Sequence, residues 1–110
     1  VLGDMLELGA ESARLHAEIG HYLAEMGVEE LFTFGTSSRQ INQGARNKGM
    51  PRRHAHHYAD LDLMLADLAG LLQPGDTLLV KGSRGMRLER VSEALRERLK
   101  TGSRIGADTE

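Results

Sequence analysis

Residues 77–89 read TLLVKGSRGMRLE, an order in which a strand, a glycine-containing loop and a helix follow one another. The apolar run over 78–80 is typical of a strand covered on both faces, and the preceding Pro-Gly-Asp turn starts it sharply. Gly82 and Gly85 allow the backbone to bend tightly, and from about Met86 apolar residues recur at helical spacing. This stretch predicts a strand–loop–helix unit whose loop lies at the carboxyl edge of a parallel sheet, where such sheets bind ligands.

The remainder of the chain repeats this alternation, with glycine, proline and N-cap residues between the segments. One strand is predicted to end near Leu2, and two more are predicted at 31–34 and 54–58. The first helix is predicted at 11–26, the second begins at the caps at 36–38 and ends at 49–51, and the third follows Asp60. The apolar stripes expected to face the core are Leu15, Ile19, Leu23 and Met26, then Leu61, Leu65, Leu68 and Leu72 with Met64 and Leu71, and finally Leu88, Val91, Leu95 and Leu99. Four alternations without a hairpin signal predict an α/β fold with a mainly parallel sheet between two layers of helices.

Composition narrows the classes of function. A chain of 110 residues forms one domain, and its 40% hydrophobic content is ordinary for a globular protein. A net charge of −2 argues against broad nucleic-acid binding, and no apolar run reaches membrane-spanning length. The absence of cysteine excludes disulfides and thiolate metal sites and is compatible with the cytosol. Residues 101–110 are expected to form a flexible tail, and the opening on what reads as a strand end predicts a fragment of a longer protein.

The loop after the predicted strand at 77–80 is the strongest candidate site. Its backbone amides and the cations Lys81 and Arg84 would attract an anion, and an arginine can bind a carboxylate through two hydrogen bonds. Ser83 can donate to a polar ligand or accept from it, and Gly82 permits close approach of the backbone. The spacing is not that of a Walker A loop. The alternative interpretation is a tight turn with exposed cations.

A second candidate is GDMLELG at residues 3–9, which also follows a strand and precedes a helix. It is therefore expected at the same edge of the sheet. Asp4 or Glu7 could receive an ammonium group there. The alternative is that Leu6 and Leu8 pack downwards while the two acids are solvated.

His54, His56 and His57 invite interpretation as a metal site, but the sequence pattern does not favour it. Strand alternation places His54 and His56 on one face and His57 on the other, and no cysteine or acid completes a ligand set nearby in sequence. His16 lies between apolar positions of its helix and is expected to be a packed or boundary residue. The basic run of Arg46, Lys48, Arg52 and Arg53 is expected to be solvated.

Three blocks of the chain resemble the C-terminal domain of the Mur ligases, a family of ATP-dependent peptide-bond-forming enzymes. The blocks are LGDMLELG at 2–9, HAEIG at 16–20 and LVKGSRGMRLE at 79–89. The resemblance covers Val1 to about Leu99. In the middle of the chain it rests only on the order and spacing of the segments, because no specific motif occurs there. The VKGSRGMRLE block is specific to the Mur ligases that join D-alanyl-D-alanine to UDP-N-acetylmuramoyl-tripeptide.

The resemblance implies that residues 1–100 form the Rossmann-like, substrate-binding domain of a cytoplasmic ligase of peptidoglycan synthesis. In this family ATP phosphorylates the tripeptide carboxylate, and the dipeptide amine then attacks the acyl phosphate. ATP and Mg²⁺ are held mainly by a central domain and the UDP sugar by an N-terminal domain, so both domains are implied partners and no cofactor is expected in this fragment. The expected substrate-binding residues are Lys81, Gly82, Ser83 and Arg84, together with Asp4 or Glu7. No catalytic residue is expected in the chain, and the isolated fragment is expected to be inactive.

The chain departs from the family pattern at its start. The C-terminal domain of the family opens with an Asp- and Asn-rich strand segment that ends in Asn-Pro and helps to bind the nucleotide, and this sequence contains none. We therefore expect a domain that lacks its first strand segment. Alternatives are another Mur-type amino-acid ligase, a stand-alone α/β anion-binding module, and an interaction domain similar to receivers. The VKGSRG block weighs against another Mur-type ligase, and the absence of a GxGxxG fingerprint weighs against a stand-alone module. A receiver needs several acidic residues around its phosphorylated aspartate, and Asp4 is the lone candidate at a strand end.

Overall fold

The computed structural model describes residues 1–6, 8–98 and 104–109. Strands and α-helices alternate in the chain, as the apolar periodicity predicts. The strands are β1 (Leu2–Gly3), β2 (Leu31–Phe34), β3 (Ala55–Tyr58), β4 (Thr77–Gly82) and β5 (Arg104–Thr109). The helices are α1 (Ser12–Glu25), α2 (Arg39–Asn47), α3 (Leu61–Leu71) and α4 (Glu89–Arg98), with short 3₁₀ turns η1 (Gly9–Glu11), η2 (Arg52–His54) and η3 (Arg84–Met86).

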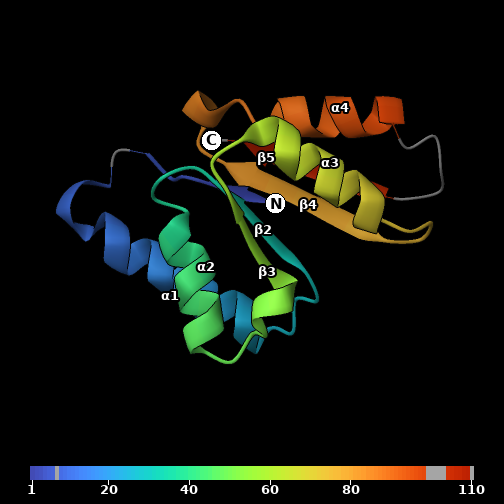
Figure 1. The fold of residues 1–110 in the computed structure, drawn as a ribbon. Coiled ribbons are helices and arrows are strands. Elements are labelled where there is room, and N and C mark those ends of the chain that lie inside the picture. Colours follow the sequence, from blue (N-terminus) through green and yellow to red (C-terminus); the bar gives the residue numbers. More distant parts are fainter. Residues whose placement is uncertain (7, 99–103, 110) are drawn as a thin grey trace.

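The five strands form one parallel sheet in the order β3-β2-β1-β4-β5. The chain builds the sheet outward from β1 through β2 to β3, then returns to the other side of β1 for β4 and β5. Helices α1 and α2 lie on one face and α3 and α4 on the other (Figure 1). The strand order therefore reverses between β1 and β4, and the loops that follow these two strands lie at the carboxyl edge of the sheet.

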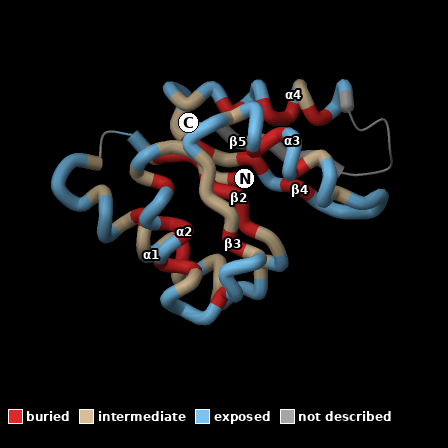
Figure 2. Tube along the Cα trace, viewed as in Figure 1, coloured by how far each residue is buried: buried red, intermediate tan, exposed pale blue. Residues whose placement is uncertain are grey.

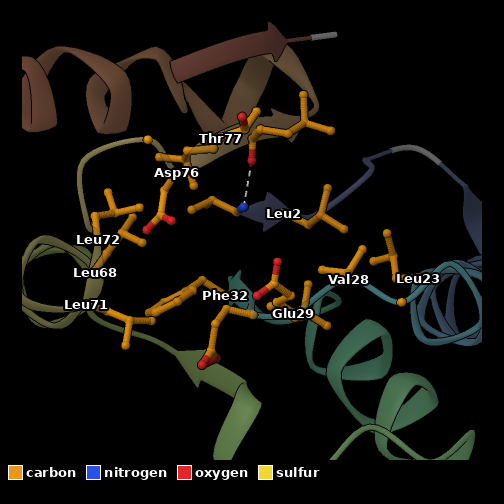
Figure 3. Close-up of a pocket in the computed structure, with 17 residues that line it drawn as sticks. Leu2, Leu23, Val28, Glu29, Phe32, Leu68, Leu71, Leu72, Asp76 and Thr77 are labelled. Atoms are coloured by element: carbon orange, nitrogen blue, oxygen red, sulfur yellow. Dashed lines mark hydrogen bonds between the residues drawn. The ribbon is translucent and has the colours of Figure 1, made fainter. Parts of the chain in front are cut away.

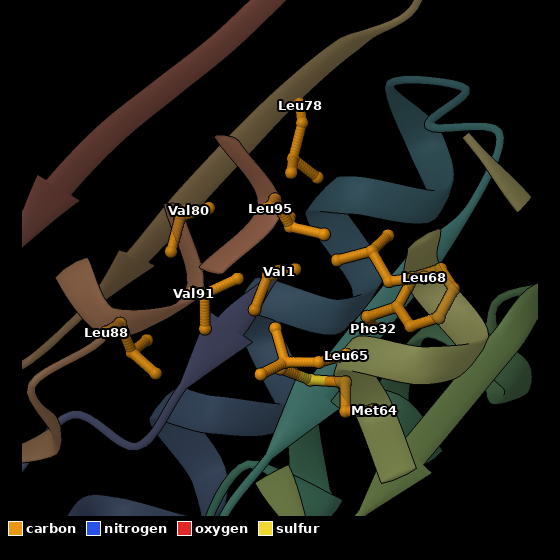
Figure 4. Close-up of a cluster of buried hydrophobic side chains, with 10 residues drawn as sticks. All are labelled: Val1, Phe32, Met64, Leu65, Leu68, Leu78, Val80, Leu88, Val91 and Leu95. Carbon is orange, nitrogen blue, oxygen red and sulfur yellow. The ribbon is translucent and has the colours of Figure 1, made fainter. Parts of the chain in front are cut away.

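Each face of the sheet has its own hydrophobic core, because successive strand residues point to opposite faces. Phe32 joins the cluster under α3 and α4, whereas its neighbour Leu31 joins the cluster under α1 and α2. The larger cluster, drawn in Figure 4, consists of Val1, Phe32, Met64, Leu65, Leu68, Leu78, Val80, Leu88, Val91 and Leu95. Figure 2 shows the buried residues along the sheet and on the inward sides of the helices. The core is almost entirely aliphatic, as expected from the few aromatic residues.

Helix α1 packs part of the predicted apolar stripe against the core, since Ile19 and Leu23 contact the cluster under α1 and α2. Leu15 and Ile19 are only half-buried and Met26 is 60% exposed, whereas His16 and Gly20 are buried. The cause is close packing against α2: a Cβ added to Gly20 would collide with the Ile41 carbonyl oxygen. A glycine at a helix contact carries no hydrophobic signal, so the apolar pattern did not indicate that His16 and Gly20 are the buried residues of α1.

Other expectations also need correction. Leu79 is 56% exposed, so β4 is not covered on both faces, because the cluster under α1 and α2 contains no residue of β4. Helix α3 is less deeply buried than expected, since Leu63 and Leu71 are exposed. His54 belongs to η2 and not to β3.

The flexible tail expected over 101–110 contains a strand. Residues 104–109 form β5 and pair in parallel with the free edge of β4, while residues 101–103 and 110 lie outside the described residues. A strand that pairs with an available edge is held by backbone hydrogen bonds and does not require apolar side chains. The polar composition of 101–110 therefore did not indicate a strand there. In the described part of the chain, no helix has the length and apolar character needed to cross a membrane.

Candidate functional site

Two loops meet at the carboxyl edge of the sheet where β1 and β4 are neighbours, and we call residues 4–6 and 83–88 the switch-point loops. Ser83 joins them twice. Its amide donates to the Asp4 carbonyl over 3.1 Å, and its Oγ accepts a hydrogen bond from the Leu6 amide over 2.7 Å. The two stretches that the sequence singled out therefore form one continuous surface at the place where parallel sheets bind ligands.

Within the described part of the chain, the Ser83 hydroxyl accepts a hydrogen bond but donates none, so its hydrogen is available to another partner. A hydroxyl has one hydrogen to donate, and the contact with the Leu6 amide uses only a lone pair of Oγ. The hydroxyl also does not cap the following turn η3. Ser83 is half-buried beside that turn, whose first amides, at Arg84 and Gly85, have no acceptor within the turn itself. This corner can therefore donate several hydrogen bonds to one anion.

The other expected substrate-binding residues surround Ser83. Lys81 is half-buried near the end of β4, and its backbone amide donates to the Val1 carbonyl over 2.9 Å. Arg84 is exposed at the start of η3. Glu7 lies outside the described residues. The loop is less directly attached to α4 than predicted, because η3 and Arg87, which has a left-handed φ of 53°, intervene before Glu89.

Gly82 is buried, and the place of its missing side chain is occupied by Leu88. A Cβ on Gly82 would lie 2.6 Å from Leu88 Cδ1 and 3.4 Å from the Cα of Gly3 on the neighbouring strand. Glycine at the ends of both strands therefore lets Leu88 pack down between the switch-point loops and the sheet. The structure gives Gly82 a packing role in addition to any contact with a ligand.

Asp4 is neither solvated nor open to an ammonium group in this structure. Its side chain is buried, and Oδ1 accepts a hydrogen bond from the Ser38 amide over 2.6 Å at the start of α2. Ser38, within the caps predicted at 36–38, is the N-cap residue of α2, but its side chain makes no capping hydrogen bond. The Asp4 carboxylate, just after β1, lies next to the positive end of the helix, which favours a negative charge. The Ser38 hydroxyl donates to the Gly35 carbonyl over 3.2 Å instead. Leu6, expected to pack downwards, is 45% exposed.

His57 extends the polar edge beyond Asp4. Its Nδ1 lies 2.8 Å from Thr33 Oγ1 on β2, and Thr33 Oγ1 donates to the His56 carbonyl. Burial lowers the pKa of His57, and the positive charge of Arg39 lowers it further, while Asp4 opposes both effects. The sequence placed His57 on the opposite strand face from its two neighbours but gave no sign of these partners, which come from other elements.

A cavity lies at the opposite edge of the sheet. It has a volume of about 670 Å³, and its walls include Leu71 and Leu72 of α3, Val28 and Glu29 before β2, and Thr77 of β4 (Figure 3). None of the sequence-predicted site residues lines it. Location relative to the strand ends, rather than cavity size, therefore identifies the candidate site.

Glu30 completes a cluster with two of the histidines at that opposite edge. Its two carboxylate oxygens lie 2.8 Å from His54 Nδ1 and 3.0 Å from His56 Nε2. The search for an acid near the histidines in sequence did not find Glu30, because it is 24 positions from His54. Within residues 1–6, 8–98 and 104–109, no group of three or more histidines and acids is arranged to hold a metal ion.

Comparison with known proteins gives one family and a consistent set of relatives. The model of the family described as "Mur ligase, glutamate ligase domain" matches residues 1–84. A Bacillus subtilis UDP-N-acetylmuramoyl-tripeptide--D-alanyl-D-alanine ligase is 35% identical over 97 residues, which cover 88% of this chain and 21% of the relative. The proteins of the same name from Escherichia coli and Mycobacterium tuberculosis are each 35% identical, over 88% and 86% of this chain and 20% and 21% of the relatives.

The chain spans about a fifth of the length of these curated relatives. No solved structure matches it significantly.

Proposed function

Because the chain belongs to the Mur ligase, glutamate ligase domain family, we propose that it is the C-terminal, substrate-binding domain of a peptidoglycan ligase. The proposed enzyme uses ATP to add D-alanyl-D-alanine to UDP-N-acetylmuramoyl-tripeptide, the reaction named for the relatives. The observation that carries the placement of the substrate is the junction of the two switch-point loops on Ser83. Central and N-terminal domains of the longer ligase are the proposed partners.

The chemistry of a dipeptide suits this corner of the domain. Its carboxylate needs hydrogen-bond donors and positive charge, which the Ser83 hydroxyl, the first amides of η3 and the side chains of Lys81 and Arg84 offer. Its ammonium group must point away from these cations. Because Asp4 already holds the Ser38 amide, we assign to its carboxylate the placement of the first switch-point loop. Of the two acids that the sequence suggests for the ammonium, Glu7 therefore remains the candidate.

The residues of this chain do not fit a complete site for ATP and Mg²⁺. The sequence has no Walker A loop, and the described residues offer no set of acids and histidines for a metal ion. We therefore place both cofactors mainly on the other domains of the longer enzyme and assign no phosphoryl-transfer step to this chain. The isolated chain is accordingly proposed to be inactive, and its part in the reaction is to bind and orient the incoming dipeptide.

The test is an Arg84→Ala change in the full-length ligase that carries this domain. Loss of one charge-assisted contact costs about 1.5–3 kcal/mol, so kcat/KM for D-alanyl-D-alanine should fall roughly tenfold to a hundredfold. The KM values for ATP and for the UDP-tripeptide should change little, because those substrates bind elsewhere. Coupled phosphate-release kinetics with each substrate varied in turn measure all three values.

Arg53→Ala is the matched control, since Arg53 is an exposed arginine in η2 at the other end of the sheet. It should leave all three KM values unchanged. Unaltered dipeptide kinetics in Arg84→Ala would refute the site. Turnover with a single amino acid in place of the dipeptide would instead identify another Mur-type ligase.

A further inference from the structure

His16 is a polar side chain in a position that apolar packing would ordinarily fill. It is completely buried on α1, next to the tightly packed Gly20. Both ring nitrogens are nevertheless engaged: Nε2 lies 3.0 Å from the Met5 amide nitrogen and Nδ1 lies 2.7 Å from the Ser12 carbonyl oxygen. A buried imidazole is tolerated where its polar atoms are satisfied, and these two contacts satisfy them.

The contacts fix one tautomer of the ring. A backbone amide can only donate, so Nε2 must accept from Met5 and carries no hydrogen. The hydrogen is then on Nδ1, which donates to the Ser12 carbonyl one turn earlier in α1. The helix thus orients the ring, and the ring presents a single acceptor to the segment that follows β1.

Three consecutive residues of that segment are held from two directions. The Asp4 carbonyl and the Leu6 amide both bond to Ser83, on the loop after β4. The Met5 amide, between them, bonds to His16 on α1. Beyond Gly3 the sheet no longer provides partners for this backbone, since β1 ends there. His16 supplies the missing one.

We propose that His16 is a positioning residue for the candidate site. By holding Met5, it keeps Leu6 against Ser83 Oγ, and this contact directs the Ser83 hydroxyl hydrogen outward toward a ligand. Loss of the acceptor leaves the part-buried Met5 amide without a partner, and we expect the segment to shift so that this amide can bond elsewhere. The role toward a dipeptide rests on the proposed function, whereas the hold on the loop does not.

The test uses three substitutions of His16 in the full-length ligase. His16→Leu removes both contacts. His16→Asn retains an amide near the Nδ1 position but is too short to reach Met5. His16→Gln places an amide oxygen near the Nε2 position and is the rescue variant. His21→Leu, at a half-buried histidine of the same helix, is the matched control.

Two readouts separate the inference from the proposed function. Backbone amide exchange in peptides covering residues 4–8 should accelerate roughly tenfold in His16→Leu and His16→Asn and return close to the wild-type rate in His16→Gln. The KM for D-alanyl-D-alanine should rise roughly tenfold in the same two variants, with little change in the KM for ATP. If His16→Leu fails to fold, the contrast between Asn and Gln decides.

Each other result has a defined meaning. Exchange at residues 4–8 that stays at the wild-type rate in His16→Leu and His16→Asn overturns the inference. So does an equal rise of all KM values that Gln does not restore, because it indicates a general loss of stability. Faster loop exchange with unchanged dipeptide kinetics refutes the substrate site and the positioning role toward it, while the contact between His16 and the loop stands.

Discussion

The carboxylate of Asp4, at the end of β1, accepts a hydrogen bond from the amide of Ser38 at the start of α2, over 2.6 Å. The two residues are 34 positions apart, so this contact fastens the first strand to a helix on one face of the sheet. The first switch-point loop is thereby held by α2 through a side chain, and by Ser83 through the backbone.

Removing the Asp4 carboxylate should destabilise the domain. Asp4→Ala leaves the buried Ser38 amide without its acceptor and removes a negative charge from the positive end of α2, and we expect a loss of about 1–2 kcal/mol. Asp4→Asn retains an acceptor oxygen and should lose less. Urea denaturation measures both, with Asp60→Ala as a benchmark, because Asp60 caps α3 at an exposed site. Equal stability of Asp4→Ala and the wild type would show that the buried contact is dispensable.

The contact between α1 and α2 depends on glycine. A Gly20→Ala change adds one methyl group that meets the Ile41 backbone, and overpacking of this kind should lower stability by about 1–3 kcal/mol. Gly70→Ala is the control: it lies in α3 with open space around it, and alanine should raise stability by up to about 1 kcal/mol. Thermal and urea unfolding should therefore shift in opposite directions for the same chemical change, and a parallel shift would contradict the packing argument.

His57 should make stability decline in mild acid. Burial and Arg39 lower the pKa of His57 from its ordinary value of 6.5. As the pH falls through 6.5, His57 becomes protonated in the unfolded chain but remains neutral in the folded chain, because its pKa is lower there. The free energy of unfolding therefore decreases. The decrease between about pH 7.5 and about pH 5.5 should be smaller in His57→Gln than in the wild type. Identical pH slopes in the two proteins would rule out this contribution.

Lys81 offers a second test of the candidate site. In the full-length ligase, Lys81→Ala should raise the KM for D-alanyl-D-alanine by roughly tenfold, because a cation beside the carboxylate is lost. Lys48→Ala, which removes an exposed lysine paired with Glu25, should leave the kinetics unchanged. A fall in kcat without a change in KM would place the Lys81 ammonium near the transferred phosphate and not near the carboxylate.

The sequence predicted those parts of the fold that depend on local pattern. The run at 78–80, the glycines beside it and the Asp60 cap each carry their signal within a few residues, so the order of strands and helices followed. The position of the two loops at one edge also followed, because every strand of a parallel sheet ends at that edge.

Contacts between distant polar residues were not predictable in the same way. His16 and Gly20 mark the buried face of α1, yet neither is large and apolar. Asp4, just after β1, bonds to the Ser38 amide at the start of α2, and Glu30, just before β2, bonds to His54 in η2. Their meaning depends on the tertiary arrangement that brings them together, which no spacing in the sequence records. The site residues therefore emerged as a list, and the structure supplied the bonds that hold them in place.

The two hydrogen bonds between Ser83 and the first switch-point loop affect the stage of folding at which the site is formed. Leu6 and Ser83 are 77 positions apart, so the two halves of the site belong to opposite ends of the chain. Contacts of such long range close large loops of unfolded chain and tend to form late in folding. A nascent or partly unfolded chain can contain α1, α2 and their strands and still present no assembled site. Binding competence at this edge is therefore an attribute of the completed domain, and a ligand that recognises it would stabilise the whole fold and not one local segment.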